Sequence, residues 1–163
     1  AIKQLSKAII KILAIVKGEQ LLIVENTAGG GQKIGAVLED LGNIIKLTKN
    51  PRVKICFDTA HGLESGLRKK YSKSNVKKLF DDFDRVIGMK KLSVLHVNDS
   101  KTAYNSKHDK HENIGEGFIG IEGFKNLARE KRITHLPWIL EVPGFSEMGP
   151  DKENINRLHS CFN

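Results

Sequence analysis

The sequence is short of cysteine, and this shortage excludes a disulfide-stapled protein. Its 163 residues include two cysteines, Cys56 and Cys161, which are too few for a disulfide framework. Cys56 lies inside the apolar run 53–57, where a buried and reduced thiol is expected. Free thiols are typical of reducing compartments, so we expect an intracellular protein, cytoplasmic or nuclear.

Long apolar runs are also absent. None approaches the roughly 20 residues that cross a bilayer, and the opening residues contain no continuous hydrophobic stretch typical of a signal peptide. No linker or low-complexity tract interrupts the chain. With 39% hydrophobic and 28% charged residues, the composition is that of a soluble globular protein. We therefore expect a single domain over 1–163, without membrane association.

Acidic residues are outnumbered by basic ones, and the formal net charge is +8. Such an excess attracts polyanions, including nucleic acid, phosphorylated substrates and anionic membranes. Lysine is abundant throughout the chain, however, also on helices that need a solvated face. The charge therefore does not by itself separate a nucleic-acid surface from general lysine usage.

Four short apolar runs alternate with longer amphipathic segments. The runs suit buried parallel strands, and the segments carry apolar residues at helical spacing. The predicted strands are 21–24, 53–57, 92–95 and 138–140. The predicted helices are 2–16, 34–47, 76–87, 122–129 and 152–158, with Ser74 as a candidate N-cap of the third. This order predicts an α/β fold in which a leading helix precedes about four β–α units, with a parallel sheet and right-handed crossovers.

Each predicted strand ends at a potential metal ligand. The carboxyl ends of parallel strands open on one face of the fold, where α/β proteins place their active sites. Imidazole nitrogen together with carboxylate oxygen is the donor set of reactive zinc sites. Seven donors exceed the needs of one ion and suffice for two or three, which suits phosphoryl chemistry. The strand-end donors are Glu25, Asp58, His96 and Glu141, and the donors in the following loops are His61, Asp109 and His111.

Other candidate residues carry less weight. The glycines 29–31 follow the first strand but lack the Lys-Ser/Thr of a phosphate-binding loop, so a flexible active-site loop is the favoured interpretation. His135 and His159 follow no strand end and are interpreted as surface or packing residues. His108 is ambiguous, and its neighbour His111 is the better ligand.

Two sequence blocks closely resemble signature blocks of the endonuclease IV family. They are ICFDTAH at residues 55–61 and LHVNDSK at residues 95–101, the second continuing to DKHENIGEG at residues 109–117. ENTAG at 25–29 and LE at 140–141 resemble the family's blocks at two other strand ends. The resemblance covers about residues 20–145. It departs at Gly30 and Gly31, which intervene before Gln32, and at Asn105, where the family commonly has glycine.

The resemblance implies a zinc-dependent apurinic/apyrimidinic (AP) endonuclease of base-excision repair. Such enzymes hydrolyse the phosphodiester 5′ to an abasic site in double-stranded DNA and leave a 3′-hydroxyl. The implied fold is a partial (β/α)8 TIM barrel that comprises the last four strands. Glu25 and Glu141 would be catalytic carboxylates, and Lys110 would face a DNA phosphate.

The resemblance also implies how the donors divide among three zinc ions. Glu25 would bridge two of them. Asp58, His96 and Glu141 would complete the second zinc, and His61, Asp109 and His111 would hold the third. The first zinc would need two histidines from earlier strands, which nothing before Glu25 supplies. We therefore expect a parent protein that contains the missing N-terminal half of the barrel, and weak or no activity from these 163 residues alone.

Two alternatives remain open. Sugar isomerases or epimerases of the xylose-isomerase-like barrels use a Glu, Asp, His, Glu set around one or two divalent metals, which Glu25, Asp58, His96 and Glu141 would fit equally well. The further donors His61, Asp109 and His111 favour the nuclease. The second alternative is a non-catalytic module that binds metal and nucleic acid without cleavage.

Overall fold

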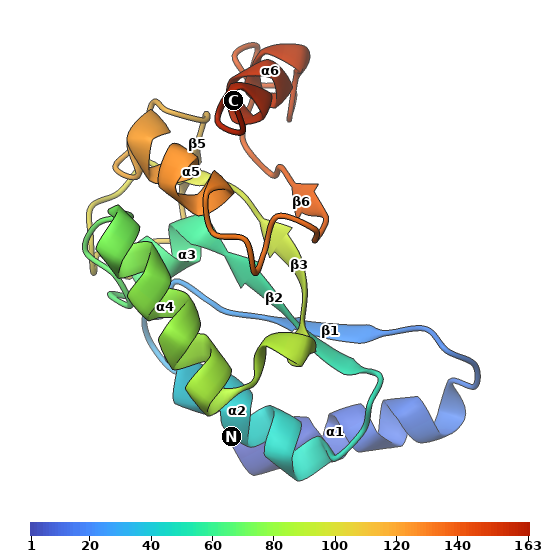
Figure 1. Cartoon of the computed structure of the whole chain (residues 1–163). Helices are drawn as coiled ribbons and strands as arrows, with labels where there is room; N and C mark the ends of the chain where they lie inside the picture. The colour runs from blue at the N-terminus through green and yellow to red at the C-terminus, as the bar shows by residue number, and fades with distance from the viewer.

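The computed structural model describes residues 1–163 and centres on a four-stranded parallel sheet (Figure 1). The strands are β1 (Leu22–Glu25), β2 (Val53–Asp58), β3 (Leu92–His96) and β6 (Trp138–Ile139), in the order β1-β2-β3-β6. Strands that follow one another in the chain are neighbours in the sheet and run parallel, so a crossover must connect each pair. The alternation of apolar runs and amphipathic segments predicted this. The register pairs Glu25 with Cys56 and Asp58 with His96, so the strand ends lie close together.

One face of this sheet shares a hydrophobic core with helices. They are α1 (Ile2–Ile15), α2 (Leu38–Thr48), α4 (Lys73–Val86), α5 (Gly120–Ala128) and α6 (Lys152–Ser160), with a short 3-10 helix η1 (Met89–Lys91) before β3. In α4 the buried residues are Val76, Leu79, Phe80 and Phe83, which is the i, i+3, i+4, i+7 spacing read from the sequence. They form one core with α2 and with Phe57 of β2. The predicted leading helix and four β–α units are confirmed.

Some details of the prediction are wrong. Helix α4 begins at Lys73, and the side chain of Ser72, not Ser74, accepts the Asn75 N–H as its N-cap. Helix α2 begins at Leu38, because Gly35 has a left-handed φ of +97° and donates its N–H to Asp40 Oδ2 (3.0 Å), which keeps residues 34–37 in a loop. The last strand ends at Ile139, two residues before Glu141.

Four short elements were not predicted: the 3-10 helix η1, a helix directly after β2, and two strands of a hairpin. Helix α3 (Thr59–Glu64) follows β2 without a loop, so His61 lies on a helix. The Asp58 side chain caps it by accepting the His61 N–H at 2.7 Å. A short antiparallel pair, β4 (Asp99–Ser100) and β5 (His111–Glu112), holds the two ends of the segment that carries Asp109. All of these elements are shorter than the windows in which periodicity is measurable.

The opposite face of the sheet is open to solvent. Leu21, Ile23 and Ile139 are 43–49% exposed and line a depression of about 390 Å³ that reaches Glu25 and His96. Strands β1 and β6 each pair on one side only. This arrangement is compatible with part of a β-barrel, in which this face would point inward. Cys56 is a buried free thiol, as expected, and Cys161 is also free and buried. None of the helices has the length and apolarity needed to span a membrane.

Candidate metal centre

The strand ends bring four predicted ligands into one group. One donor atom each from Glu25, Asp58, His96 and Glu141 lies within 4.8 Å of the others. His96 Nδ1 is 3.1 Å from Glu25 Oε1 and 3.0 Å from Glu141 Oε2. We call these residues the strand-end group. Three carboxylates around one imidazole form a donor set that favours a divalent cation, because their charges would otherwise repel one another.

The other three predicted ligands form a second group beside the first. His61 Nε2 lies 3.1 Å from Asp109 Oδ1, and His111 Nε2 lies 3.8 Å from the same oxygen. The two imidazole rings are 5.3 Å apart. Asp58 connects the groups, since its Oδ2 is 3.7 Å from His111 Nε2. We call His61, Asp109 and His111 the loop group. The structure thus brings all seven predicted residues together.

Backbone carbonyls fix the orientation of both histidines in the loop group. His61 Nδ1 lies 2.9 Å from the Asn26 carbonyl, and His111 Nδ1 lies 3.1 Å from the Glu141 carbonyl. A carbonyl can only accept a hydrogen bond, so each Nδ1 must carry the proton. In a neutral ring this leaves the Nε2 lone pair free, which is the usual arrangement of a metal-binding histidine.

Both Nε2 atoms are buried and make no hydrogen bond within the protein. Buried polar atoms are normally paired, and an exception calls for an explanation. Nitrogen lone pairs that face carboxylate oxygens at these distances suit a shared cation. The donor atoms of the loop group are therefore of the kinds that zinc binds, since zinc sites commonly combine imidazole and carboxylate donors.

Two buried asparagines that we did not predict hold the strand ends in place. Asn98 donates from Nδ2 to Asp58 Oδ2 (2.6 Å) and accepts the Glu141 N–H on Oδ1 (2.7 Å). Asn26 accepts the Asp58 N–H on Oδ1 at 2.6 Å. Each asparagine follows closely after a strand end, and a polar side chain that leaves a buried strand must find partners. Their place directly after a strand end is the feature by which the sequence could have indicated them.

The charges of the centre shift several pKa values. Burial disfavours the charged form of His61, but the hydrogen bond with Glu25 and the charges of Asp58 and Asp109 prevail and raise the pKa of His61 to about 10. Burial would likewise raise the pKa of Glu25, yet hydrogen bonds from His61 and His96 lower it to about 2. Burial raises the pKa of Asp58 above its usual value. Without a metal, the centre thus holds protons in place of cations.

These shifts predict opposite pH dependences of stability with and without metal. In chelator, the pKa of folded His61 (about 10) exceeds the unfolded value near 6.5, so its contribution is complete below pH 6.5 and declines toward pH 10. We expect the free energy of unfolding to fall by roughly 1 kcal/mol between pH 6 and 8, allowing for solvent screening. In excess zinc it should rise, since protons then compete less for the donors.

Urea unfolding at pH 6, 7 and 8, in chelator and in zinc, measures both slopes. The His61→Gln variant is the control, because it should flatten the slope in chelator. Identical slopes with and without zinc would contradict the assignment of His61 as a ligand.

The remaining candidates lie outside the two groups. Lys110 is exposed, and its backbone N–H donates to a carboxylate oxygen of Glu64 at 3.2 Å. His108 is exposed and belongs to no donor group, while His135 and His159 are exposed surface residues, as predicted. Cys56 and Glu64, which we did not predict, each share a set of closely spaced donor atoms with two of the predicted ligands.

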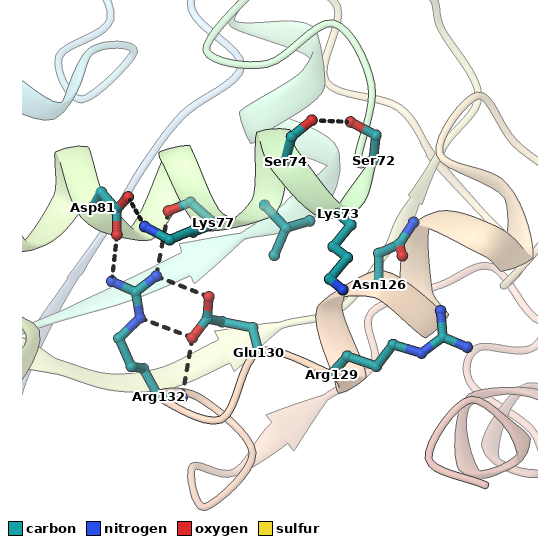
Figure 2. A pocket seen from close by; sticks show the side chains of 10 residues that line it. Ser72, Lys73, Ser74, Lys77, Asp81, Asn126, Arg129, Glu130 and Arg132 are labelled. Atoms are coloured by element: carbon teal, nitrogen blue, oxygen red, sulfur yellow. Dashed lines mark hydrogen bonds and ion pairs between the residues drawn. The ribbon is translucent and has the colours of Figure 1, made fainter.

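The largest cavity is not part of this centre. It is a groove of about 820 Å³ between α4 and α5, and Figure 2 shows its mixed charges. Arg132 pairs with Asp81 and Glu130, and Lys77 pairs with Asp81. None of its lining residues belongs to either donor group. The groove and the two donor groups are therefore separate places on the molecule.

The chain is similar to known proteins along most of its length. The family described as xylose isomerase-like TIM barrel matches residues 1–161. A probable endonuclease 4 of Halothermothrix orenii is 37% identical over 158 residues, which are 96% of this chain and 56% of that protein. One of Campylobacter fetus is 44% identical over 123 residues, 74% of this chain and 43% of that protein.

Among solved structures, endonuclease IV from Thermus thermophilus superposes with a TM-score of 0.85 at 30% identity. The match covers 99% of this chain and 57% of that one. The chain therefore spans about half the length of the relatives it matches. The family match, the endonuclease 4 relatives and the shared fold agree with one another: the chain belongs to the xylose isomerase-like TIM barrel family, in its endonuclease IV group.

Proposed function

We propose that this chain carries the metal centre of a zinc-dependent AP endonuclease, which cleaves the phosphodiester 5′ to an abasic site in double-stranded DNA and leaves a 3′-hydroxyl. The observation that supports this most is the pairing of two donor groups through Asp58, with an unpaired Nε2 on both loop-group histidines. Clustered divalent ions suit phosphodiester hydrolysis, since several cations can stabilise the charge of one transition state. The relatives named endonuclease 4 support the same reaction.

We assign the following roles to the residues of the centre. Glu25, Asp58, His96 and Glu141 would hold one zinc, and His61, Asp109 and His111 another; Glu25 would share a third ion with donors outside this chain. Bound zinc supplies Lewis acidity, which polarises the phosphodiester and activates water. Glu25 and Glu141 are the carboxylates closest to His96, and we assign them the catalytic part. Asn26 and Asn98 keep the donors in register.

The proposed substrate also fits the surface charge. The net charge of +8 favours a polyanion, and Lys110 is an exposed cation between the ligands Asp109 and His111, where it would contact a DNA phosphate. We further propose that these residues form one domain that works with additional barrel strands, because the inner face and both edges of the sheet are open. The free thiols support an intracellular location, cytoplasmic or nuclear.

A sugar isomerase is the second candidate, because the strand-end group alone would serve it. The loop group argues against it: His61 and His111 present free Nε2 atoms to Asp109, which a centre of one or two metals on the strand-end group does not require.

One experiment separates the candidates. The chain is incubated with a duplex that contains a single abasic site, with zinc or with chelator, and bound zinc is counted by elemental analysis. Chelator-sensitive incision 5′ to the lesion supports the nuclease, and we expect it to be weak from these residues alone. Salt-sensitive binding without any incision favours the non-catalytic module. Indifference to DNA would overturn both.

A further inference from the structure

The structure places one more carboxylate in the loop group. Glu64 ends helix α3 and is completely buried, within 4.8 Å of His61 and Asp109 when one donor atom of each residue is considered. We propose that Glu64 is a fourth protein ligand of the ion held by His61, Asp109 and His111. This inference rests on the proposed zinc centre and adds a ligand that the sequence blocks did not indicate.

The two oxygens of Glu64 have different surroundings. Oε1 lies 2.7 Å from the Ser100 hydroxyl and 3.2 Å from both the Thr102 hydroxyl and the Lys110 N–H. Oε2 is buried and has no hydrogen-bond partner. Burying a carboxylate oxygen without a partner is costly, because the oxygen loses its hydration and gains no hydrogen bond in return. A cation on Oε2 removes that cost.

The same contacts hold the carboxylate beside the loop group. Ser100 and Lys110 lie near the two ends of the segment that carries Asp109, and their hydrogen bonds to Oε1 fix the Glu64 side chain relative to that segment. Oε1 therefore accepts hydrogen bonds from the protein, and Oε2 is the oxygen left to bind a metal ion. With Glu64, the protein donors of this ion would be two imidazoles and two carboxylates, which are donor types that zinc binds. Glu64 would then connect helix α3 to the segment 101–111 through the ion as well as through the hydrogen bonds of Oε1.

Glu64→Gln tests the proposal with little change of shape. Glutamine retains one oxygen for the Ser100 and Lys110 donors and places an NH₂ group where Oε2 stood. Because NH₂ cannot bind a cation, zinc should lose at least tenfold in affinity at the loop group, and the strand-end group should retain its affinity. Competition titration with a chromophoric chelator and elemental analysis of the whole chain measure both sites. Circular dichroism verifies that the variant is folded.

Glu112→Gln is the matched control. Glu112 is a partly buried carboxylate on β5 that accepts the Asn113 N–H (2.9 Å) and belongs to neither donor group, so its replacement should leave both affinities unchanged. Wild-type affinity at both sites in Glu64→Gln would overturn the fourth ligand and leave the zinc centre intact. Failure of the wild-type chain to bind zinc would overturn both.

A structure of the zinc-loaded wild-type chain gives a second test that does not depend on a variant. We expect a Glu64 oxygen at about 2.0–2.2 Å from the ion of the loop group. A separation beyond about 3 Å would leave Glu64 with a purely structural role and contradict the proposal.

Discussion

Replacing Glu25 with glutamine is expected to lower zinc affinity at the centre at least a hundredfold and to reduce DNA incision by a similar factor. Glu25 Oε1 lies 3.1 Å from His96 Nδ1, and in the proposed centre this carboxylate is shared by the strand-end ion and the ion completed by donors outside this chain. Its pKa of about 2 keeps it charged at any working pH. Removing a residue that hydrogen-bonds a metal ligand typically lowers metal affinity about 10–100-fold, so removing a shared ligand itself should lower it more.

Glutamine has nearly the same shape as glutamate, so the fold should persist. Zinc per chain and chelator competition report the metal, and the abasic duplex reports incision, measured if necessary in a longer protein that contains this sequence. The exposed Glu19 offers a control, because Glu19→Gln removes the same charge away from both groups. Equal zinc affinity in Glu25→Gln and Glu19→Gln would refute the role of Glu25 as a shared ligand.

The second large effect concerns stability. Asp99→Ala is expected to lower the free energy of unfolding by about 3–5 kcal/mol, because it removes the acceptor for several buried N–H groups. The carboxylate of Asp99 is completely buried. Its oxygens accept the backbone N–H of Ser100, Gly115, Gly117, Ile119 and Gly120 at 2.8–3.1 Å.

Urea unfolding of the metal-free chain measures this effect, so that zinc binding does not contribute. Asp84→Ala is the matched control: Asp84 is exposed and accepts one backbone N–H, from Met89, so the loss should remain below about 1 kcal/mol. When zinc is present, Asp99→Ala should lower the zinc affinity of the loop group more than that of the strand-end group, because Asp99 pairs with Glu112 in the hairpin that carries His111. A loss near that of Asp84→Ala would contradict the proposed role of Asp99.

Asp99 also explains a motif that the sequence presented without a reason. Gly115 and Gly117 belong to a block that resembles the endonuclease IV family, and the structure shows what they allow. A Cβ on Gly117 would lie 2.6 Å from Asp99 Oδ1 and would collide with the Ser100 carbonyl. Only glycine lets the backbone approach this carboxylate closely enough to donate its N–H.

The sequence by itself determined the β–α alternation and the seven donors. Buried strands and amphipathic helices are local patterns of hydrophobicity, so β1, β2, β3 and α4 could be read from short windows. Donors such as Asp58 and His96 could be placed together because parallel strands end on one face of a sheet. Both inferences need only the chain order and one rule of topology.

Only the tertiary structure decided which atoms meet. Glu64 was missed because the groups that orient it, Ser100 and Lys110, lie 36 and 46 residues further along the chain. His61 was assigned to a loop, since helix α3 is a single short element capped by Asp58 itself. Local periodicity records which residues are buried, but pairing between distant side chains depends on how the crossovers fold back. The sequence therefore indicated seven candidate donors, and its family resemblance implied their division. The packing of distant segments decided which further side chains, such as Glu64, lie beside them.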